Sequence, residues 1–118
     1  MSAIHLSKAG FDSRIAKIDT LASEWKFLGE RPALIDFFAT WCSPCQRLSP
    51  IIDELADEYK DKVDIYKVDV DSEQELAALF RVRSIPTLVY IPMSGAPIVA
   101  PGGRSKAELK ALIEERLL

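Results

Sequence analysis

The sequence has little of several features that would assign it to other classes of protein. It contains only two cysteines and one histidine, whereas a structural zinc site requires about four ligands. No apolar run approaches the roughly 20 residues that a membrane-spanning helix needs, so we expect no membrane insertion. The net charge is −3 and the basic residues are scattered, which argues against a nucleic-acid partner. Without repeats or linkers, residues 1–118 are predicted to form a single domain.

The first residues carry no secretory signal. Met1-Ser2-Ala3-Ile4-His5-Leu6 lacks a basic region followed by a long apolar stretch, so we expect a cytoplasmic protein. A periplasmic or secreted protein from which a signal peptide had been removed would look the same. Two cysteines within one motif are compatible with either compartment.

The two cysteines lie in Trp41-Cys42-Ser43-Pro44-Cys45, at a predicted strand-to-helix junction. Residues 34–39 form an apolar run of strand length, and apolar residues recur on one helical face from Gln46 to Tyr59. Free backbone N–H groups and the helix dipole at a helix N-terminus favour a thiolate at Cys42. The pair is therefore predicted to be a dithiol redox centre. The alternative is that Cys42 and Cys45 are merely small hydrophobic residues of the core, but such residues would not need this spacing.

The rest of the pattern predicts an α/β fold, in which helices cover both faces of a central mixed β-sheet. Strands at 33–39 and 63–70 flank the long helix in a β-α-β unit with parallel pairing. A hairpin turn at 92–97 joins strands 87–91 and 98–100.

Three further helices are expected, one after Ser7, one opened by Asp71-Ser72 and one that ends at Leu117. Ser72 with Glu75, and Ser105 with Glu108, have the spacing of a capping box. Residues 19–31 are expected to be irregular or to include a short helical turn.

Three separated segments resemble the thioredoxin family, and the resemblance runs over nearly the whole chain. They are Asp36-Phe37-Phe38-Ala39-Thr40-Trp41-Cys42-Ser43-Pro44-Cys45, Ser84-Ile85-Pro86-Thr87 and Pro101-Gly102. The resemblance implies a thioredoxin fold, a monomer and a general protein disulfide reductase with no cofactor beyond a redox-active Cys42–Cys45 disulfide. It implies disulfide-containing protein substrates and recharging by a flavin-dependent thioredoxin reductase or an equivalent dithiol donor. It also implies a cis bond before Pro86, with Pro86 against the two sulfurs.

Five residues are assigned to the exchange chemistry: Cys42, Cys45 and Asp36, and, by the family resemblance, Pro86 and Lys67. Cys42, first in the turn and nearer solvent, is the predicted nucleophile, and Cys45 is the resolving thiol. Asp36 is the polar exception in an apolar strand; a buried carboxyl with a raised pKa would relay a proton to or from Cys45. An edge aspartate that faces water is the alternative. By resemblance, Lys67 is the candidate partner of Asp36.

A second group of residues is assigned to substrate binding. Trp41 is either an exposed anchor or part of the core. Pro44 fits the first helical turn, and the Ser43 hydroxyl can donate to the Cys42 thiolate or cap a backbone N–H. An apolar surface on which an extended substrate segment can lie is expected to include Ile85, Pro101 and Gly102.

The direction of exchange stays open at this point. A reductase, an oxidase or isomerase on the same scaffold, and a non-enzymatic binding or holdase module all fit the motif. The first two differ in reduction potential. The third predicts full function after both cysteines are replaced by serine.

Overall fold

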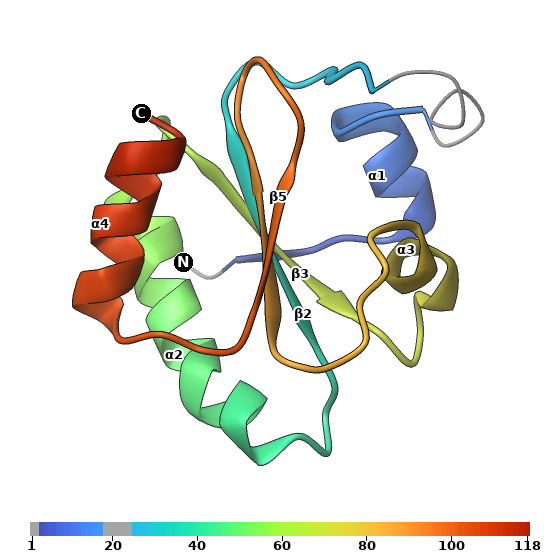
Figure 1. The fold of residues 1–118 in the computed structure, drawn as a ribbon, viewed down its shortest axis with the longest axis vertical. Coiled ribbons are helices and arrows are strands. Elements are labelled where there is room, and N and C mark those ends of the chain that lie inside the picture. The colour runs from blue at the N-terminus through green and yellow to red at the C-terminus, as the bar shows by residue number, and fades with distance from the viewer. Residues whose placement is uncertain (1–2, 18–24) are drawn as a thin grey trace.

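The structure, a computed structural model, describes residues 3–17 and 25–118. Its centre is a five-stranded sheet with the strand order β1-β3-β2-β4-β5 (Figure 1). The strands are β1 (Ile4–His5), β2 (Ala33–Phe38), β3 (Asp64–Asp69), β4 (Thr87–Ile91) and β5 (Ile98–Pro101).

Helices cover both faces of this sheet, as the sequence pattern predicts. They are α1 (Lys8–Arg14), α2 (Ser43–Glu58), α3 (Gln74–Leu79) and α4 (Lys106–Arg116). Figure 1 shows α2 and α4 on one side of the sheet and α1 and α3 on the other. In the described residues, no helix is long and apolar enough to cross a membrane.

The strand pairing confirms the predicted β-α-β unit and hairpin. Strand β2 runs parallel to β3 and antiparallel to β4, and β4 pairs with β5 in antiparallel fashion. Strand β1 was not predicted, because two residues are too few for an alternating pattern. It pairs with β3, and the register places His5, Lys67 and Asp36 in one row across three neighbouring strands.

The alternation of β2 explains why Asp36 faces helix α2. Ile35 and Phe37 are buried in the core beneath α1 and α3, whereas Leu34 is buried in the core beneath α2 and α4. Because successive strand residues point to opposite faces, Asp36 lies on the same face as Leu34. The carboxyl is therefore enclosed between the sheet and the helix that carries the cysteines.

The two predicted capping boxes have different outcomes. Ser105 is the N-cap of α4; its Oγ accepts the Glu108 backbone N–H at 3.2 Å, and Glu108 Oε1 accepts the Ser105 backbone N–H at 3.2 Å. The prediction at Ser72 is wrong, because α3 begins only at Gln74 and its N-cap has no side-chain hydrogen bond. Asp69 accounts for the difference: its carbonyl accepts the Glu73 N–H at 2.8 Å and holds a turn ahead of the helix.

Helix α2 begins at Ser43, in agreement with the predicted helix N-terminus at the cysteine motif, because the Cys42 sulfur accepts a backbone N–H and Pro44 fits the first turn. Residues 25–32 form neither helix nor strand, in agreement with an irregular segment. Trp25 and Phe27 pack against the core beneath α1 and α3. Residues 19–24 of the predicted irregular segment lie outside the described ranges.

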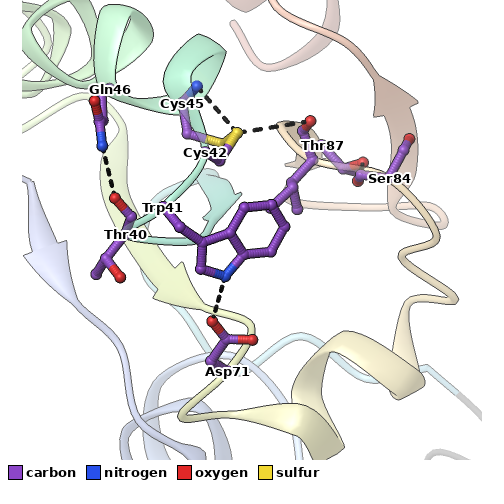
Figure 2. Close-up of a disulfide and its surroundings, with 9 residues drawn as sticks. Thr40, Trp41, Cys42, Cys45, Gln46, Asp71, Ser84 and Thr87 are labelled. Carbon is purple, nitrogen blue, oxygen red and sulfur yellow. Dashed lines mark hydrogen bonds between the residues drawn. A yellow bond between two sulfur atoms is a disulfide. The ribbon is translucent and has the colours of Figure 1, made fainter.

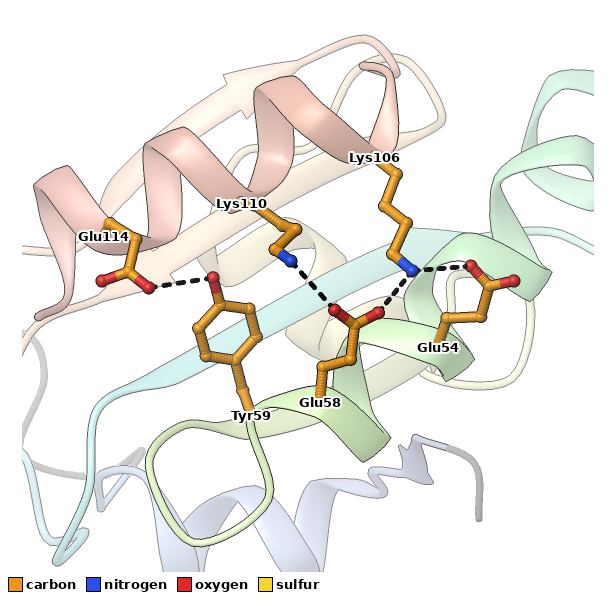
Figure 3. Close-up of polar contacts among 6 residues, drawn as sticks. All are labelled: Glu54, Glu58, Tyr59, Lys106, Lys110 and Glu114. Atoms are coloured by element: carbon orange, nitrogen blue, oxygen red, sulfur yellow. Dashed lines mark hydrogen bonds and ion pairs between the residues drawn. The ribbon is translucent and has the colours of Figure 1, made fainter.

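Polar contacts join α2 to α4 (Figure 3). The Glu58 carboxylate pairs with the ammonium groups of Lys106 and Lys110, and Lys106 also lies 3.2 Å from Glu54. The Tyr59 hydroxyl donates to Glu114 at 3.1 Å. These contacts extend from Lys106 to Glu114 along α4 and involve both lysines of that helix.

Candidate active site

The disulfide between Cys42 and Cys45 closes the first turn of helix α2 (Figure 2). Cys42 is the N-cap residue, with extended backbone, and its Sγ accepts the backbone N–H of Cys45 at 3.3 Å. The Cα atoms of the two cysteines are 5.2 Å apart. After reduction, the same N–H and the positive end of the helix dipole would stabilise negative charge on the Cys42 sulfur.

Both cysteines are buried in the oxidised protein, with exposed fractions of 5% for Cys42 and 2% for Cys45. Cys42 is nearer solvent, as expected, but the difference is small. Their positions distinguish them more clearly: Cys42 precedes the helix, whereas Cys45 lies inside its first turn.

The loop before β4 lies against the cysteines. The Ile85–Pro86 bond is cis, as the family resemblance implies. The Ile85 carbonyl oxygen is 3.9 Å from Cys42 Sγ, a contact drawn in Figure 2. Gly102 donates its N–H to the Pro86 carbonyl at 2.8 Å with a φ of +93°, a conformation that glycine adopts without strain. Pro101 precedes it in β5, opposite Thr87.

Trp41 is an exposed side chain rather than part of the core, with 68% of its surface accessible. Its indole Nε1 donates to Asp71 Oδ2 at 2.8 Å (Figure 2). Gln46 donates its side-chain amide to the Thr40 carbonyl at 2.7 Å, which ties the loop before the cysteines to α2. Sequence reasoning missed Asp71, because the turn after β3 meets Trp41 only in the folded chain.

Asp36 is buried, with 1% of its surface exposed, so the alternative of an edge aspartate facing water is wrong. Burial raises the pKa of this carboxyl from 3.8 to about 7, although the positive charge of Lys67 acts in the opposite direction. The negative charge of Asp53 raises it further. Among the described residues, Asp36 Oδ1 has no hydrogen-bond partner.

Lys67, the candidate partner of Asp36, acts on that carboxyl through its positive charge but makes no direct ion pair with it. Its ammonium instead lies 2.9 Å from Asp53 Oδ1 and donates to Ser49 Oγ at 2.6 Å. Sequence reasoning did not predict Asp53 and Ser49 as partners of Lys67. Their spacing of four residues puts them on one side of α2, next to the buried Leu48 and Ile52, and this polar pair was the available signal.

An internal disulfide at a helix N-terminus can be opened by an attacking thiolate, and the dithiol that results can reduce another disulfide. The class that this fold and site define is therefore a thiol-disulfide oxidoreductase. Comparison with known families agrees, because the family model described as Thioredoxin matches residues 2–115. The chain belongs to the thioredoxin family.

Several curated thioredoxins are similar to this chain. That of Borreliella burgdorferi is 44% identical over 92 residues, which cover 78% of this chain and 79% of the relative. That of Haemophilus influenzae is 36% identical over 114 residues, or 97% and 96% of the two chains. The thioredoxin of Acidithiobacillus ferridurans is 36% identical over 87 residues, or 74% and 81%.

Family membership and the Cys42–Cys45 disulfide together make this protein an oxidoreductase that works by dithiol exchange. Its redox group is part of the chain, and thioredoxins carry no cofactor. The family implies disulfide-containing substrates and a reductase that restores the dithiol.

Proposed function

We propose that this protein is a general protein disulfide reductase that acts in the cytoplasm as a monomer, with residues 1–118 as a single thioredoxin domain. Its electron donor is a thioredoxin reductase or an equivalent dithiol donor. One observation carries the proposal: Cys42 Sγ, at the N-cap of α2, accepts the Cys45 N–H at 3.3 Å. This position favours a thiolate on Cys42, which is the nucleophile that opens a substrate disulfide near neutral pH.

In the first exchange, the Cys42 thiolate attacks one sulfur of a substrate disulfide. A bond forms between Cys42 Sγ and that sulfur, the substrate S–S bond breaks, and the second substrate sulfur leaves as a thiolate. The product of this step is a mixed disulfide between Cys42 and the substrate.

In the second exchange, Asp36 takes the proton of the Cys45 thiol, and the Cys45 thiolate attacks Cys42 Sγ. The Cys42–Cys45 disulfide forms and the mixed disulfide breaks, so the second substrate sulfur leaves as a thiolate. The proton that Asp36 took from Cys45 can then pass to this thiolate. A pKa of about 7 suits Asp36 to this task, because such a carboxyl accepts and releases protons near neutral pH. Lys67 acts on Asp36 through its charge.

The substrate segment lies across the surface beside the sulfurs. Trp41, Ser43, Pro44, Pro101 and Gly102 are exposed. Half-buried Ile85 lies beside Cys42, where an extended segment could pair with its backbone. Pro86 shapes the surface next to Cys42.

The test is the reduction of insulin disulfides in the presence of dithiothreitol. Cys42→Ser should abolish turnover, since the nucleophile is lost, whereas Cys45→Ser should accumulate a mixed disulfide with the substrate. Trapping on Cys45 instead would reverse the assigned roles. Equilibration with glutathione gives the direction, and a potential above about −200 mV would indicate an oxidase.

A further inference from the structure

A surface groove lies beside the disulfide, between the first turns of α2 and the loop that leads from β5 to α4. It has a volume of about 330 Å³ and is lined by Pro44, Arg47, Leu48, Ile51, Gly103 and Arg104, together with Ser105 and Glu108 at the start of α4. Leu48 and Ile51 provide apolar surface, and the arginines come from two separate elements.

The groove begins where the exchange takes place. Pro44 is between the two cysteines, and a Cβ atom placed on Gly103 would be only 3.8 Å from the Pro86 side chain. A polypeptide whose sulfur is bonded to Cys42 therefore has a direct path into the groove. Residues that flank the exchanged cysteine are the ones that would occupy it.

The charge of the groove is positive, although the whole chain carries −3. Arg47 and Arg104 are both exposed, and no ion pair holds either of them within the described ranges. The nearby Lys106 and Lys110 are already paired with Glu54 and Glu58 (Figure 3).

Glu108 is the one carboxylate that lines the groove. Its Oε1 accepts the Ser105 N–H at 3.2 Å in the capping box. The hydrogen bonds with Ser105 lower the pKa of the Glu108 carboxyl, and the positive charge of Arg104 lowers it to a smaller extent. Two guanidinium groups against this single, already bonded carboxylate leave a net positive site.

We propose that this groove binds an acidic segment of the protein substrate, adjacent to the cysteine that exchanges with Cys42. The inference rests on the proposed reductase function and adds a preference among its substrates. Guanidinium groups bind carboxylates through paired hydrogen bonds, and the apolar floor accommodates the stems of the acidic side chains. Arg47 and Arg104 are thus specificity-determining residues for substrates with acidic flanks.

The experiment uses synthetic peptides with one internal disulfide, flanked by aspartates, asparagines or lysines. The variant Arg47→Gln/Arg104→Gln removes both charges of the groove. The matched control, Lys60→Gln/Lys62→Gln, removes two exposed positive charges just beyond the other end of α2. Arg47 lies 11 residues before Glu58, the last residue of α2, so about 16 Å of helix separates Arg47 from the end that precedes the control residues.

The reduced wild-type protein should reduce the aspartate peptide about fivefold faster than the asparagine peptide at low salt, since exposed ion pairs have modest strength. The ratio should fall towards one in Arg47→Gln/Arg104→Gln and as ionic strength rises, and should persist in the lysine control. A wild-type ratio of one, a preference for the lysine peptide, or an equal loss in the control would overturn the proposal.

A binding measurement separates this inference from the proposed function. Fluorescently labelled peptides with serines in place of cysteines are titrated with the oxidised protein, so no exchange takes place. Weaker binding of the aspartate peptide to Arg47→Gln/Arg104→Gln than to the wild type supports the groove even if the neutral disulfide peptide is not reduced. Equal affinity of the wild type for aspartate and asparagine peptides would overturn it, whatever the rate of reduction.

Discussion

The Lys67 ammonium lies 2.9 Å from the Asp53 carboxylate, although Lys67 is opposite Asp36 in the register of the sheet. Ser49 accepts a hydrogen bond from the same ammonium at 2.6 Å, and the Ala3 N–H donates to Asp53 Oδ1 at 3.1 Å. The Lys67 ammonium, which could neutralise Asp36, is thus held by Asp53 and Ser49 of α2 instead. Burial then dominates, and the pKa of Asp36 rises to about 7.

Replacing the buried carboxyl should stabilise the protein at alkaline pH and slow its chemistry. A carboxyl whose folded pKa is raised contributes its full stability below its ordinary pKa of 3.8, and this contribution is lost as pH rises to about 7. Asp36→Asn should therefore match the wild type near pH 4 and exceed it at pH 8 by on the order of 4 kcal/mol. Urea unfolding at both pH values measures this difference.

Exchange by Asp36→Asn should also be slower near neutral pH, since the proton acceptor for Cys45 is lost. Asp61→Asn is a suitable control, because Asp61 is exposed and asparagine tolerates its positive φ. A normal exchange rate in Asp36→Asn would rule out the proton relay, and the same stability gain in the control would show that burial of the Asp36 charge is not its cause.

Loss of the group that holds Lys67 should move the pH profile of exchange. Asp53→Asn removes a negative charge that raises the pKa of Asp36 and releases the Lys67 ammonium towards it, so both effects lower that pKa. The rate of the second exchange should reach half of its maximum at a lower pH than in the wild type. Rapid-mixing kinetics between pH 5 and 9 give this midpoint.

Glu54→Gln is the matched control for this variant. It removes an acidic side chain from the same helix, one that pairs with Lys106 rather than Lys67. An unchanged midpoint in Asp53→Asn, or the same shift in Glu54→Gln, would show that Asp53 does not position the cation.

The Ser43 hydroxyl should have little influence on the redox potential. Within the described residues it makes no hydrogen bond, and the N-cap acceptor of α2 is the Cys42 sulfur itself. A weak, solvated hydrogen bond to the thiolate would contribute about 0.5 kcal/mol, or about 10 mV. Ser43→Gly should shift the potential to more reducing values by no more than this. A glutathione titration that shows a change above about 60 mV would contradict it.

The two serines with capping-box spacing should respond differently to replacement. Ser105→Ala removes the hydroxyl that accepts the Glu108 N–H at the start of α4 and should lower the free energy of unfolding by about 1 kcal/mol. Ser72→Ala should stay within about 0.5 kcal/mol of the wild type, because Ser72 caps no helix. Equal effects in a denaturant titration would show that the Ser105 contacts are not stabilising.

Local patterns were sufficient for the main elements and for the redox centre. The spacing of Cys42 and Cys45 before an amphipathic run predicts a dithiol at a helix N-terminus, because one helical turn brings such residues together. The apolar run around Asp36 predicts a buried carboxyl, since a strand residue shares the environment of its neighbours on the same face. These inferences need only the periodicity of helices and strands.

The partners of these residues were decided by the tertiary structure. Asp53 and Ser49 bind Lys67, and Asp71 binds Trp41. Asp53 is 14 residues from Lys67 in the sequence, and Asp71 is 30 residues from Trp41. The groove with Arg47 and Arg104 likewise joins two elements that are distant in sequence. The sequence alone determined that a buried carboxyl and a dithiol exist; packing decided which charges face them, because side-chain direction depends on how helices lie on the sheet.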